Sequence, residues 1–109
     1  MPAYLVVAHK ITDAAKFEEY RSKVAPMIAH FGGRYLTKGG SHKILEKGFQ
    51  IATTDSSGRS SQWEPERVVL IEFPDMETLN AWYQSPEYQP LIKLRHDSAL
   101  DMLMTLEGA

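Results

Sequence analysis

The sequence contains no cysteine, so it can form neither a disulfide framework nor a thiolate metal site, and its stability must come from burial and association. This composition fits a reducing compartment, and we expect a cytoplasmic protein. The chain also lacks an apolar run of the roughly 18 residues that a membrane span requires. Its first residues, MPAYLVVAHK, show no small-residue cleavage site after a basic start. We therefore expect no membrane partner and no export signal.

A surplus of basic residues is missing as well. Twelve Lys and Arg are scattered among fourteen Asp and Glu, and the formal net charge is -2. Such a chain has no attractive field for phosphates, so nucleic acid is not expected as a partner. The four histidines show no HxH, HxxxH or HExxH spacing, and no GxSxG, P-loop or GxGxxG motif occurs. The sequence thus predicts no metal, no cofactor and no covalent nucleophile.

What the sequence does contain is an ordinary globular composition, with 109 residues of which 43% are hydrophobic and 24% charged. This predicts one domain over residues 1–109. Apolar periodicity divides it into alternating strands and helices. The expected elements are a strand at 3–9, a helix capped by Asp13 and ended by Gly32-Gly33, a strand at 34–46 broken around Gly39-Gly40, a strand at 66–73, a helix capped by Asp75, a further helix starting at Ser85-Pro86, and a strand at 99–107. Pro26 predicts a bend near Ser22 unless the last turn is a separate segment.

This order predicts an α+β, ferredoxin-like βαββαβ fold, with a four-stranded antiparallel sheet and the helices on one face. The strands at 3–9 and 66–73 are apolar at both parities, so the face away from the helices is expected to be hydrophobic too. Leaving about six such side chains exposed would cost on the order of 10 kcal/mol, similar to the stability of a whole domain. We therefore expect a homodimer in which a second copy covers this sheet face, with a monomeric sandwich as the alternative.

Several runs of the chain are similar to a known family. They are WEPERVVLIEFPD at 63–75, AWYQSPEYQPLIKLR at 81–95, FGGRYL at 31–36 and the closing LEG at 106–108. Together they resemble the uncharacterised DUF1330 family of the dimeric α/β-barrel superfamily. The resemblance implies the dimeric barrel fold and, for an enzyme of this superfamily, cofactor-independent isomerisation, lyase action or oxygenation of a small aromatic or anionic metabolite. Haem degradation also occurs in the superfamily, but no histidine here has a convincing ligand context.

The segment 49–62 departs from the family pattern, in which leucine, glutamate and glycine lead almost directly into the tryptophan motif. We interpret it as an insertion. Because it is rich in Ser, Thr and Gly and has no apolar period, it is expected to be a tolerated surface loop. A lid over a pocket is the alternative.

Arg95 is the most informative candidate, because it lies seven residues after Tyr88 on a helical stripe where an apolar residue is expected. Burying an unpaired guanidinium is costly, so Arg95 needs either a carboxylate such as Glu72 or an anionic ligand. Glu72 interrupts the apolar strand on the parity of Val68 and Leu70. It is therefore a candidate for proton transfer or for the counter-ion of Arg95.

The other candidates are aromatic, basic or loop residues. Trp82, Tyr83 and Tyr88 surround the Ser85-Pro86 break and offer groups that can orient a small polar ligand. Ser85 and Arg67 are further ligand-binding candidates. His42 lies in the glycine-flanked GGSHK segment and is a candidate catalytic acid or base. For each of these a structural role in the core, at the rim or in solvent is the simpler alternative.

Two hypotheses of function follow. The first is a dimeric barrel that binds a small anionic or aromatic metabolite in a pocket between sheet and helices, lined by the aromatic group and Arg95, with Glu72 or His42 for proton transfer. The second is a non-catalytic ligand-binding or stress-associated module in which Arg95 and Glu72 are a structural pair. Fold alone does not choose between them.

Overall fold

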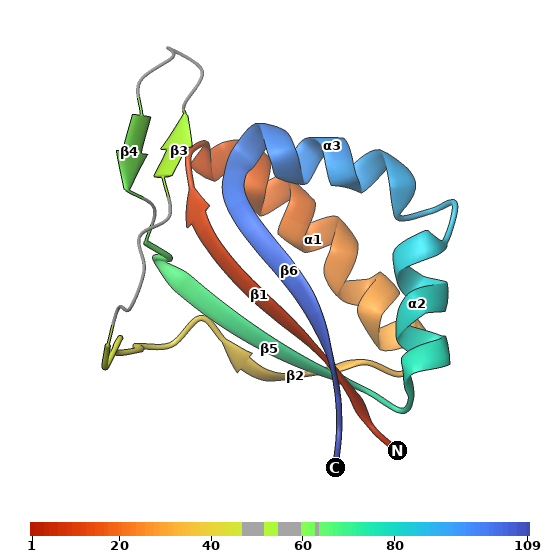
Figure 1. Ribbon diagram of the computed structural model, residues 1–109. Helices are drawn as coiled ribbons and strands as arrows, with labels where there is room; N and C mark the ends of the chain where they lie inside the picture. The colour runs from red at the N-terminus through yellow and green to blue at the C-terminus, as the bar shows by residue number, and fades with distance from the viewer. Residues whose placement is uncertain (47–51, 55–59, 63) are drawn as a thin grey trace.

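The fold is an antiparallel sheet covered on one side by helices (Figure 1). The computed structural model describes residues 1–46, 52–54, 60–62 and 64–109. Its elements are β1 (Ala3–Ile11), α1 (Ala14–His30), β2 (Arg34–Lys38), β3 (Ala52–Thr54), β4 (Ser60–Gln62), β5 (Arg67–Phe73), α2 (Met76–Gln84), α3 (Gln89–Ser98) and β6 (Ala99–Glu107). Four strands form one sheet in the order β2-β5-β1-β6, with antiparallel neighbours. This is the ferredoxin-like α+β fold, and the predicted fold class is confirmed.

The helix boundaries follow local chemistry. Asp13 accepts a hydrogen bond from the Lys16 backbone N–H and caps α1, and Asp75 does the same for α2 through Thr78. These caps satisfy N–H groups that have no partner inside the helix. After α1 the chain turns at Gly32, whose φ of 79° is readily adopted only by glycine. Both capped starts and this glycine stop agree with the sequence prediction.

Two local predictions differ from the structure, and one alternative is excluded. Pro26 lies inside one continuous helix, so the alternative in which the last turn of α1 is a separate segment is excluded. Residues 41–46 are irregular and form no second extended piece. The helix expected at Ser85-Pro86 begins three residues later, at Gln89, because the Ser85 hydroxyl donates to the Trp82 carbonyl oxygen and does not cap a following turn.

The expected surface loop at 49–62 contains β3 and β4, which pair antiparallel as a separate two-stranded sheet. Pairing of short Thr- and Ser-rich strands leaves no apolar period, so the hydrophobic pattern could not reveal it. The rest of this segment lies outside the described residues, and the expectation of a lid falls on those residues.

A β-bulge in β2 decides which side chains reach the helix-covered face. Tyr35 pairs with Ile71, but the register then shifts, so that Thr37 pairs with Leu70 and Lys38 with Val69. Without the extra residue, Tyr35 and Lys38 would point to opposite faces. With it, both side chains lie on the face under the helices.

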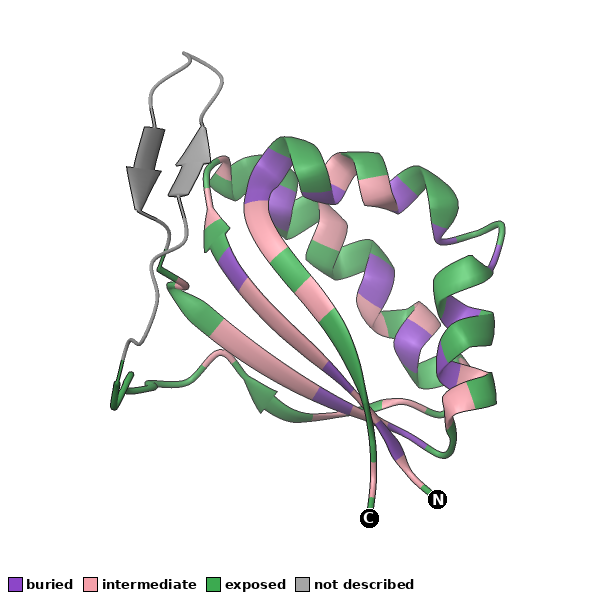
Figure 2. Ribbon diagram, in the orientation of Figure 1, coloured by how far each residue is buried: buried purple, intermediate pink, exposed green. Residues whose placement is uncertain are grey.

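The inner face of the sheet, the one under the helices, holds the core (Figure 2). Odd-numbered residues of β1 and β5 point inward, and Leu5, Ile71 and Phe73 are each at most 3% exposed. Helices α1 and α2 close over them with Ile28 and Trp82, 2% and 1% exposed. Burial of these large side chains supplies the main favourable contribution to folding.

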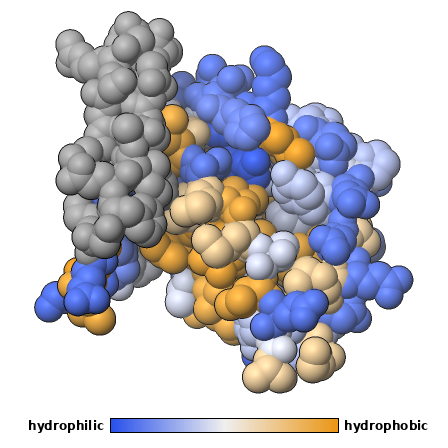
Figure 3. Space-filling model, in the orientation of Figure 1, coloured by the Kyte–Doolittle hydropathy of each residue, from blue (hydrophilic) through white to orange (hydrophobic). Residues whose placement is uncertain are grey.

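The outer face of the sheet is also apolar. Even-numbered positions of β1 align with those of β5 and β6 and form a grid, consisting of Tyr4, Val6, Ala8, Val68, Leu70, Met102, Met104 and Leu106. The β6 members are the most exposed, from 40% for Met102 to 56% for Leu106. Figure 3 shows apolar atoms gathered over the sheet.

Among the described residues, no helix has the length and apolar character to cross a membrane.

The junction between α1 and β2 tests how closely helix and sheet are packed. A Cβ at Gly33 would lie 2.7 Å from Ile28 Cγ2 and 3.0 Å from Phe73 Cε1. We expect Gly33→Ala to lower the free energy of unfolding by about 1–3 kcal/mol through overpacking. Gly40→Ala is the matched control, since no atom lies within 4 Å of its Cβ, and it should change stability by less than about 0.5 kcal/mol. Urea unfolding measures both, and equal effects would contradict the packing described.

Candidate functional site

The candidate site is a cavity of about 340 Å³ between the inner face of the sheet and α1. This volume lies within the range of small-molecule sites in proteins. The apolar wall is contributed by three strands and the helix, through Leu5, Val7, Val24, Ile28, Ile71 and Leu103. Such a wall favours a ligand with an apolar body.

Four polar side chains are linked beside this wall. Arg95 Nε on α3 lies 2.9 Å from Asp101 Oδ2 on β6. Arg95 Nη1 donates to the Tyr88 hydroxyl at 2.9 Å, and that hydroxyl lies 2.9 Å from the hydroxyl of Tyr20 on α1. Arg95, Asp101 and Tyr20 line the cavity. The polar network therefore connects α1, α3 and the sheet around one space.

The ion pair at the centre of this network is deeply buried. The side chains of Arg95 and Asp101 are 6% and 8% exposed. Although their charges are close, the Nε–H does not point at the carboxylate, and neither Arg95 Nε nor Asp101 Oδ2 has a hydrogen bond among the described residues. Burial raises the pKa of Asp101, while Arg95 and His96 oppose that shift. Buried polar atoms without partners have capacity left for a polar group of a ligand.

The two tyrosines remain protonated donors. Burial raises the pKa of Tyr20, and the neighbouring Tyr88 raises it further. Burial also raises the pKa of Tyr88, against the lowering effect of its hydrogen bond to Tyr20 and of Arg95. At neutral pH both phenols therefore keep their protons. Tyr20, which faces the cavity, can donate to an oxygen atom placed there.

Two further polar atoms of cavity-lining residues have no hydrogen bond within the described part of the chain. His9 Nε2 and Trp82 Nε1 are buried and make no hydrogen bond to any described residue. Both residues line the cavity. Most buried polar atoms in proteins are hydrogen-bonded, so two such atoms at one cavity make it a candidate site for a ligand with polar groups.

The cavity carries more positive than negative charge. Of the described residues that line it, Arg21, Lys38, Arg67 and Arg95 are cationic, whereas only Asp101 is anionic. Arg21 is bound to Glu18 at 2.7 Å on the surface, and Lys38 lies 5.6 Å above the Tyr35 ring. This leaves a net positive potential, which favours an anionic ligand. No group of three His, Asp or Glu suited to a metal ion occurs in the described part of the chain.

The family of the chain is settled by its sequence. The model of the family described as Domain of unknown function (DUF1330) matches residues 2–109. The chain belongs to this family. The resemblance seen in the sequence is thus confirmed. None of the curated proteins matches this DUF1330 chain.

Solved structures resemble this DUF1330 chain over almost its whole length. A crystal structure of a protein of unknown function from Rhodopseudomonas palustris has a TM-score of 0.72 at 15% identity, covering 99% of this chain and 82% of that one. SnoaB, a cofactor-independent oxygenase from Streptomyces nogalater, has a TM-score of 0.57 at 9% identity, with coverages of 99% and 93%. A dimeric protein of unknown function and ferredoxin-like fold from Bacteroides fragilis has 0.55 at 10%, with coverages of 98% and 96%. At these identities the likeness shows the fold alone.

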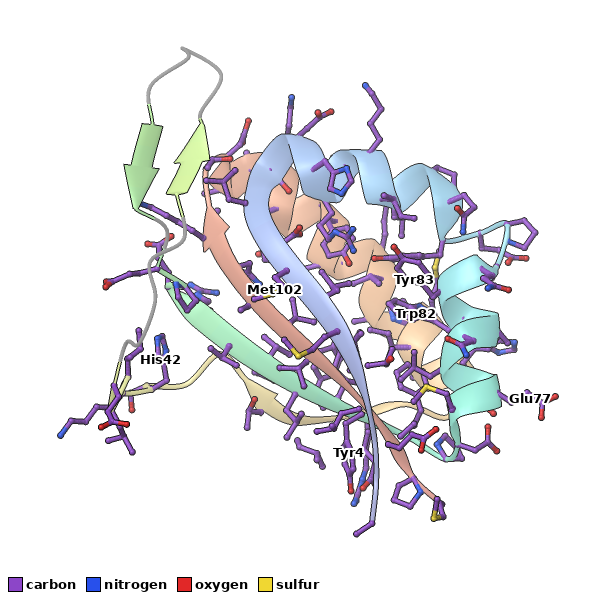
Figure 4. All side chains as sticks on the ribbon, viewed as in Figure 1. Tyr4, His42, Glu77, Trp82, Tyr83 and Met102 are labelled. Atoms are coloured by element: carbon purple, nitrogen blue, oxygen red, sulfur yellow. The ribbon has the colours of Figure 1, made fainter. Side chains whose placement is uncertain are left out.

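Of the ligand-binding candidates found in the sequence, three line the cavity: Arg95, Trp82 and Arg67. Tyr88 is fully buried and reaches the site through its hydroxyl contacts with Arg95 and Tyr20. Tyr83 and Ser85 do not line the cavity. Tyr83 is 38% exposed and packs its ring 6.0 Å from Trp82 (Figure 4), and Ser85 binds the backbone of α2.

The pairing of Arg95 with Glu72 is wrong. Glu72 aligns with Tyr4 on β1 and with Arg34 on β2, which places it on the outer face, and its carboxylate lies 2.9 Å from Arg34 Nε. The counter-ion of Arg95 is Asp101 on the inner face. As a proton-transfer candidate, Glu72 is therefore separated from the cavity by the sheet itself.

His42 is likewise remote from the cavity. It is exposed in the irregular segment after β2, on the side of the molecule opposite Trp82 and Tyr83 (Figure 4). Neither catalytic candidate from the sequence thus lies in the cavity that the structure forms.

Sequence reasoning missed Asp101, Tyr20 and His9 as members of the site. His9 places a polar group on a β1 parity otherwise occupied by Ala3, Leu5, Val7 and Ile11, so its signal was present in the sequence. Asp101, which faces His9 across β1 and β6, shares its parity with Leu103 but also with Thr105 and Glu107 and gave no comparable signal. Tyr20 gave no such signal, because a tyrosine on an apolar helical stripe is typical of a core.

The identity of the buried pair leads to a direct test. Asp101→Asn leaves the Arg95 guanidinium buried without a counter-charge, which should lower the free energy of unfolding by about 3–5 kcal/mol. The control is Glu72→Gln, whose partner Arg34 is 71% exposed, and it should cost less than about 1 kcal/mol. Urea denaturation at neutral pH measures both variants. A larger loss in Glu72→Gln would show that the assignment of the buried pair is incorrect.

Proposed function

We propose that this chain is a small-molecule-binding protein whose ligand is a largely apolar monoanion, aromatic or alicyclic in body, held in the cavity beneath α1. The observation that carries this proposal is the pair of buried polar atoms, His9 Nε2 and Trp82 Nε1, that have no hydrogen bond to any described residue and belong to side chains lining a largely apolar cavity, beside the buried ion pair of Arg95 and Asp101. An apolar core without a ligand has no use for such atoms, because each costs free energy when left unpaired.

The arrangement of the cavity supports an orientation for the ligand. The apolar body packs against the wall formed by β1, β5 and α1. Its charged end lies beside the sheet row of His9, Arg67 and Asp101, which are aligned across three strands. Arg67 has no ion pair with any described residue, and the positive φ of Gly39 places its Cα against the Arg67 stem, where a Cβ would lie 3.1 Å from Cδ. Arg67 is thus positioned by Gly39 and has no counter-ion among the described residues, as suits an anion-binding group.

The proposal includes a homodimer formed through the outer face. This face presents a continuous apolar grid, and Glu72 on it is neutralised by Arg34. A monomer would leave the grid in water, whereas a two-fold pair of identical sheets buries it. The dimeric ferredoxin-like protein from Bacteroides fragilis supports this assembly by its fold.

A catalytic role is favoured by one further similarity. SnoaB, which shares the fold, is described as a cofactor-independent oxygenase, so a protein of this fold can act without a cofactor. We extend to this chain only the idea of cofactor-independent chemistry on a small metabolite.

Ligand binding can be tested with 2-naphthoate as the probe. Ala25 lines the cavity from α1, so Ala25→Phe should fill it and weaken 2-naphthoate binding at least tenfold. Ala29→Phe adds the same side chain at an exposed position of the same helix and should bind as the wild type does. Calorimetric titration gives the dissociation constants. The proposal fails if the wild type does not bind 2-naphthoate, or if both variants bind it equally well.

The charge of the ligand is tested in the same titration with neutral 2-naphthamide. Its affinity for the wild type should be at least about tenfold lower, a difference of about 1.4 kcal/mol. Arg67→Gln should reduce the difference in affinity between 2-naphthoate and 2-naphthamide. An equal affinity of the wild type for both would exclude an anionic ligand class.

The assembly is tested by sedimentation at micromolar concentration, where the wild type should be a dimer. Met104→Glu places a charge in the middle of the apolar grid and should shift the protein to monomer or make it unstable, because a charge cannot be buried there unpaired. Gln84→Glu adds the same charge at an exposed position of α2 and should leave the dimer intact. A monomeric wild type would refute the proposed interface.

A further inference from the structure

His9 gives the site a titratable group in addition to its proposed contacts with a ligand. It lies on the inner face near the end of β1 and is 5% exposed. Its ring packs 4.9 Å from the Phe17 ring on α1, so the imidazole is held between helix and sheet. Nε2 is buried without a hydrogen bond to any described residue. An imidazole nitrogen in a cavity with no protein partner is free to act on a ligand.

The surroundings of His9 keep it neutral. Arg67 on β5 and Asp101 on β6 are its neighbours across the sheet, and Glu66 precedes Arg67. Tyr20 and Arg95 face the same cavity from α1 and α3. Burial lowers the pKa of His9, Arg67 lowers it further, and Glu66 acts in the opposite direction. In the tautomer that carries its proton on Nδ1, the neutral ring offers the Nε2 lone pair as a base at neutral pH.

The same cavity provides donors for a developing negative charge. Tyr20 contributes a protonated hydroxyl, and Arg95 has a fixed positive charge beside it. Fixed donors in a buried site stabilise an oxyanion more strongly than water does. A base and an oxyanion-binding group therefore face one apolar space.

On this geometry, and resting on the proposed ligand cavity, we infer that His9 is a catalytic base that enolises a small aryl 2-oxo acid, so that the protein interconverts its keto and enol forms. The carboxylate of such a substrate meets the cationic side of the cavity. Its aryl ring occupies the apolar wall, and its carbonyl oxygen faces the donors of Tyr20 and Arg95.

The proposed step balances without an added reactant. His9 Nε2 takes a proton from the carbon next to the carbonyl. The electron pair of the broken C–H bond forms the carbon–carbon double bond, and the carbonyl π pair moves to oxygen to give an enolate. The imidazolium then returns the proton to the enolate oxygen, which gives the enol. The reverse sequence regenerates the keto form, and no oxidant or reductant takes part.

The test uses phenylpyruvate, an aryl 2-oxo acid whose enol is followed by its ultraviolet absorbance. The wild type should accelerate ketonisation of the enol above the buffer rate, and it should accelerate exchange of the C3 protons in D₂O. His9→Gln should reduce both rates by about 100-fold or more, the range expected for loss of a general base. His30→Gln, at an exposed position of α1, is the matched control and should keep the wild-type rates.

Two further measurements separate catalysis from folding and from binding. The wild-type rate should be full at neutral pH and fall as pH drops below a midpoint lower than the usual 6.5 of histidine, because burial and Arg67 lower the pKa of His9. His9→Gln should still bind 2-naphthoate and keep the wild-type circular dichroism. If His9→Gln retains the catalytic rates, or if the wild type binds 2-naphthoate without accelerating either reaction, the inference about His9 is wrong while the binding proposal stands. If the wild type binds no probe, both proposals fall.

Discussion

The buried pair of Arg95 and Asp101 is the constraint on which the site depends. A guanidinium between a helix and a sheet is tolerated only with a counter-charge, because the loss of hydration is too costly otherwise. Asp101 supplies it from the inner row of β6, which ties α3 to the edge of the sheet. Arg95 also donates to Tyr88, which contacts Tyr20. One charge pair thus helps to set the spacing of α1 and α3 above the strands. The cavity occupies the space between the sheet and α1.

The sequence predicted the elements better than it predicted the partners. Arg95 was recognisable because a charge on an apolar helical stripe needs an explanation, and its spacing of seven residues from Tyr88 matches the observed hydrogen bond. Its counter-ion was not recognisable. Glu72 interrupts the apolar strand β5, whereas Asp101 lies on a mixed parity of β6 with Leu103 and Thr105. Both parities of β1 and β5 are apolar, so the period of two does not reveal which parity the helices cover. Only the register of three strands separates them.

Irregular backbone accounts for the remaining differences. The bulge after Tyr35 turns Lys38 to the inner face, whereas a regular strand would send it outward. No residue pattern in the segment RYLTKGG predicts this change in register. The pairing of β3 with β4 was hidden for a related reason, since short polar strands are stabilised by backbone hydrogen bonds and carry no apolar signature. Hydrophobic periodicity thus predicts elements that bury apolar side chains. It does not predict bulges or polar strand pairs, which depend on backbone hydrogen bonds.

Strand β1 connects the cavity with the proposed interface. It is flanked by β5 and β6, and its side chains alternate between the two faces: Leu5, Val7 and His9 point to the cavity, and Tyr4, Val6 and Ala8 to the outer grid. A slip of one residue would exchange these sets and place His9 on the apolar outer face. Desolvation of the outer grid therefore opposes the slip that would destroy the inner row. If the outer face is covered by a second copy, the register that holds His9, Arg67 and Asp101 in line is stabilised by contacts made on the opposite side of the same strands.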